Sequence, residues 1–233
     1  MFWRFAVSAI LSVPFLSAQP HLEKEAVLGQ ALAEAVLRKT VPVDAASARD
    51  YAGRLADRLA PHLPPTGHPY RVAIVAHGDT PYEPKALPGG FVFVPAQLFL
   101  EAADAHEFAA MLAHAMAHVA ARHGMSPAPA PDAVPKPMVY LGEIPGGMEA
   151  YEREADLLAV IALSAAGFDA GALSRYLERV RPDDARVARR INLLSGRPTR
   201  RPEPAVDDFV AARDAVRAAL PPPPVRQPPS LYR

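Results

Sequence analysis

His114-Ala-Met-Ala-His118 is the stretch of this 233-residue sequence on which the interpretation of the rest depends. Histidines at positions i and i+4 lie on one face of a helix, where both rings can bind one zinc ion. In the common zinc motif His-Glu-x-x-His, the second residue is a glutamate that serves as general base. Ala115 stands at that position here. The stretch predicts a metal helix without its base, although a chain with eight histidines can also place two at this spacing by chance.

A second helix, expected over residues 148–166, supplies the carboxylates that such a site needs. Glu152 and Asp156 are also spaced i and i+4 and share a face. A glutamate can be the third zinc ligand, and an aspartate one turn later can hold the second nitrogen of a ligand histidine. Glu154 faces elsewhere, about 200° around the helix from Glu152, and Glu149 is the next candidate in another register. The alternative is a solvated charge cluster.

The composition limits the class of function. The chain has 25 basic and 25 acidic side chains and no strongly basic block, so nothing favours binding to nucleic acid. It has no cysteine, which excludes disulfides, a thiolate metal site and a cysteine nucleophile. Any metal must therefore be held by histidines and carboxylates. Half of the residues are apolar, enough for the core of one domain.

Both ends of the chain are expected to lie outside the main domain. Residues 1–18 carry a basic residue, an apolar run and then small residues, the order typical of an export signal. The run is short for a membrane span and Pro14 interrupts it, so a retained anchor is the weaker alternative. Residues 19–195 form the domain, and residues 196–233 a proline-rich tail with a short helix. We expect an exported protein, periplasmic or extracellular, without a stable membrane span after signal removal.

Hydrophobic periodicity predicts an α+β fold that is mostly helical, with a small β-sheet beside the metal helix. Between residues 70 and 94, short β-rich runs flank a loop with prolines and glycines. The expected helices cover residues 22–37, a stretch from Asp44 or Ser47 to Pro61, 106–123 with Gly124 just beyond its end, 148–166, 170–180 and 204–220.

Several separate segments, in this order, resemble the zinc metallopeptidase family that includes the CAAX prenyl endopeptidases, the HtpX-like proteases and their periplasmic relatives. They are Glu25–Gln30, Ala86–Val94, Phe108–Gly124, Glu152–Asp156 and Ala166–Asp169. The third is similar to the family's metal helix throughout, and the fourth matches its Glu-x-x-Ala-Asp element. The resemblance covers roughly residues 23–180, and it implies a zincin-like fold of gluzincin type.

The resemblance also implies a site. It places one zinc ion on His114, His118 and Glu152, with Asp156 as the partner of a ligand histidine. His123 is not expected among the ligands, because it lies in the last turn of its helix, where an imidazole can interact with exposed carbonyl groups.

A substrate-binding strand follows from the same resemblance. The segment from Phe91 to Val94 is expected to be an edge strand that receives an extended peptide by β-pairing, beginning at Phe91 and Val92. Gly89 and Gly90 would allow the two backbones to approach closely. For the two glycines, a simple turn is the alternative.

Ala115 separates the hypotheses about function. The family implies a zinc-dependent endopeptidase that hydrolyses peptide bonds in exported or misfolded proteins, with an unfolded or extended polypeptide as partner. A positioned general base contributes about 10²- to 10⁴-fold in rate, so the alanine predicts impaired hydrolysis. One alternative is an inactive exported module, chaperone-like, that binds zinc and peptides. Another is a structural helical domain with incidental histidines and glutamates. Nothing in the sequence indicates an oligomeric state.

Overall fold

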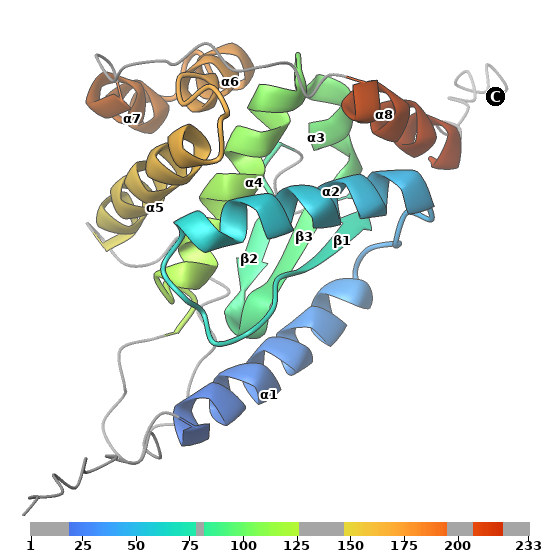
Figure 1. Cartoon of the computed structure of the whole chain (residues 1–233), viewed down its shortest axis with the longest axis vertical. Helices are drawn as coiled ribbons and strands as arrows, with labels where there is room; N and C mark the ends of the chain where they lie inside the picture. The colour runs from blue at the N-terminus through green and yellow to red at the C-terminus, as the bar shows by residue number, and fades with distance from the viewer. Residues whose placement is uncertain (1–18, 78–81, 126–146, 195–206, 221–233) are drawn as a thin grey trace, which may run out of the picture.

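The computed structural model of the chain describes residues 19–77, 82–125, 147–194 and 207–220. In these residues, helices surround one small β-sheet (Figure 1), which confirms the α+β class. The elements follow the chain in the order α1 (Gln19–Leu37), α2 (Ala46–Leu59), η1 (Ala60–His62), β1 (Arg71–Val75), β2 (Lys85–Leu87), η2 (Pro88–Gly90), β3 (Phe91–Pro95), α3 (Ala96–Glu101), α4 (Ala105–Ala120), α5 (Gly147–Ala165), α6 (Ala172–Val180), α7 (Ala185–Leu194) and α8 (Asp207–Ala219). The predicted export signal, residues 1–18, lies outside the described residues.

The three strands form one sheet in the order β1-β3-β2. β3 runs parallel to β1, with Val92 beside Val72, and antiparallel to β2, with Val92 beside Ala86. The expectation that Phe91 to Val94 is an edge strand is therefore wrong, because β3 is the central strand. The order of strands depends on long-range pairing, which the sequence pattern alone does not specify. The edge strand next to β3 is β2.

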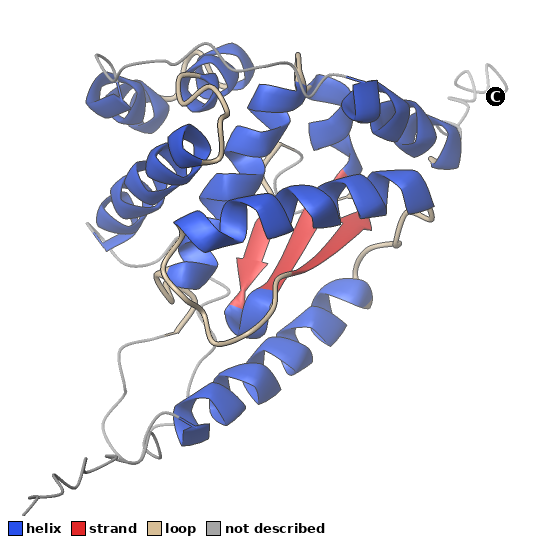
Figure 2. Ribbon diagram, viewed as in Figure 1, coloured by secondary structure: helices blue, strands red, loops and turns tan. Residues whose placement is uncertain are grey.

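Helices cover both faces of the sheet (Figure 2). One face, with Val92 and Val94, packs into the main core together with α2 and α4. The other face, with Phe93, forms a smaller apolar cluster with Leu32 and Ala33 of α1. This alternation follows from the pleat, since successive side chains of a strand point to opposite faces.

α4 is the central helix of the fold, and almost all of its side chains are buried. The Asp104 carboxylate caps its first turn by accepting hydrogen bonds from the backbone N–H groups of His106 and Glu107, both at 2.9 Å. At its other end, Arg122 adopts φ 55°. The N–H of Arg122 bonds to the carbonyl of Val119, and the N–H of His123 to that of His118, which is a Schellman turn. The arginine, rather than Gly124, therefore takes the left-handed position.

Two helices are not among those expected, and one cap differs. α3 and α7 lie outside the helices expected in the sequence analysis. The residue that caps α2 is Ala45, without a side-chain hydrogen bond, so neither Asp44 nor Ser47 caps it.

α8 belongs to the main core, although the sequence favours a tail from residue 196. Phe209 of α8 is 2% exposed. Its ring lies 5.9 Å from that of Tyr51 in α2 and 5.6 Å from that of Phe108 in α4, measured between centroids. The hydrophobic core therefore extends into the C-terminal region.

Candidate metal centre

His114 and His118 project from the same face of α4 and are both buried. Their Nε2 atoms lie 3.1 Å apart. The i, i+4 spacing places the two rings one above the other on the helix. The residues between them, Ala115, Met116 and Ala117, are apolar and buried as well. The two histidines thus present two nitrogen donors toward one point.

Glu152 of α5 supplies a carboxylate to the same point, because α5 packs along α4. Its Oε2 atom lies 3.4 Å from Nε2 of His114, and its Oε1 atom 3.4 Å from Nε2 of His118. Zinc–ligand distances of about 2.0–2.2 Å with tetrahedral angles place neighbouring ligand atoms roughly 3.3–3.5 Å apart. The two Glu152 contacts fall in this range, each through a different oxygen, and the separation of the two Nε2 atoms lies just below it, so these three residues form a possible metal site.

Asp156 lies one turn after Glu152 and is buried beside His114. Its Oδ1 atom is 2.9 Å from Nδ1 of His114. A carboxylate at this nitrogen holds a proton there and leaves Nε2 free to bind a metal.

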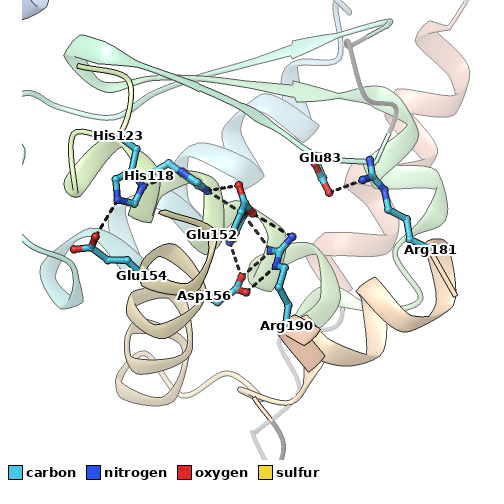
Figure 3. A network of polar contacts seen from close by, with 9 residues as sticks. Glu83, His118, His123, Glu152, Glu154, Asp156, Arg181 and Arg190 are labelled. Atoms are coloured by element: carbon cyan, nitrogen blue, oxygen red, sulfur yellow. Dashed lines mark hydrogen bonds and ion pairs between the residues drawn. The ribbon is translucent and has the colours of Figure 1, made fainter. Parts of the chain in front are cut away.

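Arg190 of α7 is a residue of the site that the sequence interpretation does not include (Figure 3). Its guanidinium donates two hydrogen bonds to Asp156, at 2.8 Å and 2.7 Å, and lies 3.1 Å from Oε2 of Glu152. The paired bonds fix the plane of the Asp156 carboxylate. The sequence does contain a signal for α7: Val187, Ile191 and Leu194 have the i, i+4, i+7 spacing of an amphipathic helix.

His123 and Glu154 extend the network on the opposite side (Figure 3). Nδ1 of His123 lies 3.0 Å from Nδ1 of His118, and Nε2 of His123 lies 3.1 Å from Oε2 of Glu154. The His123 ring also stacks on Tyr151, with centroids 4.4 Å apart. The expected contact of His123 with helix-end carbonyls is replaced by a contact with a ring of the metal site. Glu154 stays outside the triangle, as its position on the helix predicts.

Charges in the site are strongly coupled. Burial lowers the pKa of His114, but the carboxylates of Asp156 and Glu152 outweigh it and raise that pKa to about 9. Burial, together with the charge on His114, lowers the pKa of His118 to about 3. Burial alone would raise the pKa of Glu152, but its bond to His114 holds that pKa below the usual range. In the metal-free pair the extra proton therefore belongs to His114, and a metal ion that binds both Nε2 atoms displaces it.

Ala115 occupies the position of the motif glutamate and is buried. Its methyl group cannot accept a proton. Glu107, seven residues before His114, is held elsewhere: it accepts a hydrogen bond from the backbone N–H of Ala103 at 2.8 Å and pairs with Arg179. It also begins about 10 Å away along the helix axis, so it does not replace the missing carboxylate.

The residues expected to bind substrate have structural roles. Gly89 and Gly90 are buried, with φ 73° and 90°, and a Cβ atom on Gly90 would lie 2.2 Å from the Pro69 carbonyl oxygen. They form the turn between β2 and β3, as the alternative interpretation has it. Val92 is fully buried in the central strand, so it cannot pair with a peptide. In the part of the chain that the structure describes, no strand pairs with the outer side of β2.

Two imidazoles and one glutamate on adjacent helices are the ligand set of one class of catalytic zinc site in metallopeptidases. A comparison with family models agrees with this class: residues 54–181, more than half of the chain, match peptidase family M48. The chain therefore belongs to peptidase family M48. A search of curated proteins gave no significant match. None of the described helices is long and apolar enough to cross a membrane.

Proposed function

We propose that the chain is a zinc-binding member of this family that holds an extended polypeptide beside the metal and hydrolyses peptide bonds with an impaired mechanism. The triangle of His114, His118 and Glu152 carries this proposal, because it brings two imidazole nitrogens and a carboxylate within reach of one ion, the donor types that zinc takes in metallopeptidases. When bound, zinc lowers the pKa of a water molecule toward 7 and polarises a peptide carbonyl.

The outer edge of β2 is the proposed binding strand for the polypeptide. β2 contacts the metal helix α4, and it is the outermost strand on this side of the sheet among the described residues, where an extended peptide adds by β-pairing. Lys85 and Ala86 are half-buried there. Backbone hydrogen bonds along an edge strand favour an extended chain and make few demands on its side chains, which suits an unfolded polypeptide.

Impairment follows from Ala115. His114, His118 and Glu152 are assigned to the metal, and Asp156 is bonded to Arg190. None of these four side chains is therefore assigned as a general base in place of the missing glutamate. Loss of a positioned base reduces the rate of proton transfer from an attacking water by about 10²- to 10⁴-fold.

A second candidate function is an inactive module that binds zinc and extended peptides, without turnover. Ala115 favours it, since the ligand set stands complete around an alanine. In both cases we propose an exported protein, periplasmic or extracellular, on the basis of the signal-like order of residues 1–18.

The experiment compares cleavage of an unfolded protein substrate by the wild-type chain and by Ala115→Glu, each loaded with zinc. An impaired peptidase gains about 10²- to 10⁴-fold in the substituted form, and a chelator abolishes the gain. Ala115→Glu/His118→Ala is the control for contaminating proteases and should stay inactive. An Ala115→Glu protein that binds zinc and still does not cleave would favour the binding module.

A further inference from the structure

We propose that His123 and Glu154 select the nitrogen with which His118 binds the metal, and so act as positioning residues of the centre. This inference rests on the proposed zinc site. It concerns a chain of two contacts that runs from a surface carboxylate, through one buried ring, to a ligand ring (Figure 3).

The chain begins at Glu154, whose side chain is 58% exposed. A carboxylate accepts hydrogen bonds and has no proton to donate when it is ionised. Its neighbour at 3.1 Å is Nε2 of His123, so this nitrogen must carry the proton and donate it. A neutral imidazole has one N–H group. When the ring of His123 is neutral, its Nδ1 is then an acceptor.

The second contact transfers this constraint to His118. Nδ1 of His118 lies 3.0 Å from Nδ1 of His123, and two acceptors at that distance would repel each other. With zinc between the Nε2 atoms of His118 and His114, which lie 3.1 Å apart, Nδ1 of His118 therefore carries the proton. Its Nε2 lone pair is left free, and this is the atom that faces His114 and Glu152. If His118 carried its proton on Nε2 instead, that hydrogen would occupy the metal position. Nδ1 of His123 would then have to donate to His118, and Nε2 of a neutral His123 would face the Glu154 carboxylate as a second acceptor.

The backbone after α4 adopts an unusual conformation that supports this arrangement. The Schellman turn after α4 places His123 against His118, and it requires Arg122 at φ 55°, which is uncommon for a residue other than glycine. The Arg122 guanidinium bonds to the buried Glu25 carboxylate at 3.0 Å and to the Thr66 carbonyl at 3.2 Å. These bonds hold the strained turn.

The two ligand histidines are thus oriented in different ways. Asp156 contacts Nδ1 of His114 directly, whereas Glu154 reaches Nδ1 of His118 through the ring of His123. The ring of His123, through which Glu154 acts on His118, is buried, and Tyr151 stacks on it. An imidazole in this position acts as a directional acceptor, which an aliphatic side chain of similar size cannot replace.

The test measures zinc affinity by competition with a chromogenic chelator, in the full-length chain at one fixed pH. His123→Ala should weaken zinc binding by about 10- to 100-fold, as is usual when a partner of a ligand histidine is removed. His123→Asn keeps an acceptor at the place of Nδ1 and should recover most of the affinity. Glu154→Ala, at an exposed position, should weaken binding toward the lower end of that range.

Two controls separate this effect from general ones. His62→Ala removes an exposed histidine from η1, and Arg153→Ala truncates the exposed neighbour of Glu154; both should bind zinc as wild type does. A nitrogen NMR spectrum of the zinc-loaded protein adds a readout that packing alone would not change. It should show Nδ1 of His118 donating a hydrogen bond to Nδ1 of His123 in the wild type, and this bond should weaken in Glu154→Ala.

The outcomes are distinguishable from those of the proposed function. If the wild-type chain does not bind zinc, the proposed site fails and this inference fails with it. If the wild type binds zinc and His123→Ala binds it equally well, only the inference is overturned. Should His123→Ala fail to fold, Glu154→Ala and His123→Asn decide: wild-type affinity in Glu154→Ala together with an unchanged hydrogen bond between His118 and His123 overturns the inference.

Discussion

Replacing Arg190 by methionine should destabilise the metal-free protein by about 3–5 kcal/mol, the usual cost of breaking a buried ion pair. The Arg190 and Asp156 side chains are 8% and 3% exposed, and two hydrogen bonds of 2.8 Å and 2.7 Å join them. Methionine keeps much of the volume and removes the charge. Asp156 then remains buried near Glu152 with two fewer donors, and its desolvation is no longer offset.

Urea unfolding followed by circular dichroism, with a chelator present, measures this difference. Arg54→Met is the matched control, because Arg54 forms an exposed pair with Asp208 at 2.9 Å, with side chains 61% and 70% exposed. That pair should contribute at most about 1 kcal/mol. The double variant Arg190→Met/Asp156→Asn should recover part of the loss, since the unpaired charge is gone. Equal losses for Arg190→Met and Arg54→Met would contradict this account of the site.

Two further substitutions test the frame that holds the site. Phe209→Ala should lower the free energy of unfolding by about 3–5 kcal/mol, because the Phe209 ring is buried among Tyr51, Phe99 and Phe108. A midpoint of urea unfolding that is unchanged from the wild type would show that α8 is a dispensable tail. Gly29→Ala should cost about 1–3 kcal/mol, since a Cβ atom there would lie 2.0 Å from the Pro88 carbonyl oxygen. Protection of α1 amides in hydrogen exchange should fall in the same variant, and unaltered protection would refute close docking of α1 on η2.

Much of the fold and of the triangle was predictable because both depend on short-range patterns. The helical spacing of His114 and His118, and of Glu152 and Asp156, places each pair on one face of a helix. The metal helix and the α5 helix then need only to pack against each other for the four side chains to meet. The structure does bring them together.

The parts that the sequence did not predict depend on long-range geometry. Arg190 reaches the site only because α7 folds back against α5, and nothing near Arg190 in the sequence indicates that contact. The position of β3 between β1 and β2 likewise follows from pairing between distant residues.

The contact between His123 and His118 was not predicted because the turn after α4 depends on distant residues. Glycine is the residue type that most often takes the left-handed conformation after a helix, so Gly124 was the expected position of that turn. A turn at Gly124 would end α4 two residues later than the turn at Arg122 does. Instead, side-chain bonds to Glu25 and Thr66, far away in the sequence, hold Arg122 in that conformation. Only with the turn at Arg122 does His123 face His118.

The central claim is that His114, His118 and Glu152 together hold one zinc ion. Zinc content per folded chain, measured by atomic emission after dialysis, tests it most directly when combined with the single variants His114→Ala and Glu152→Ala. We expect one zinc per wild-type chain and a large loss in each variant, with the circular dichroism of the fold retained. Substoichiometric zinc in the wild-type chain that His114→Ala leaves unchanged would contradict it.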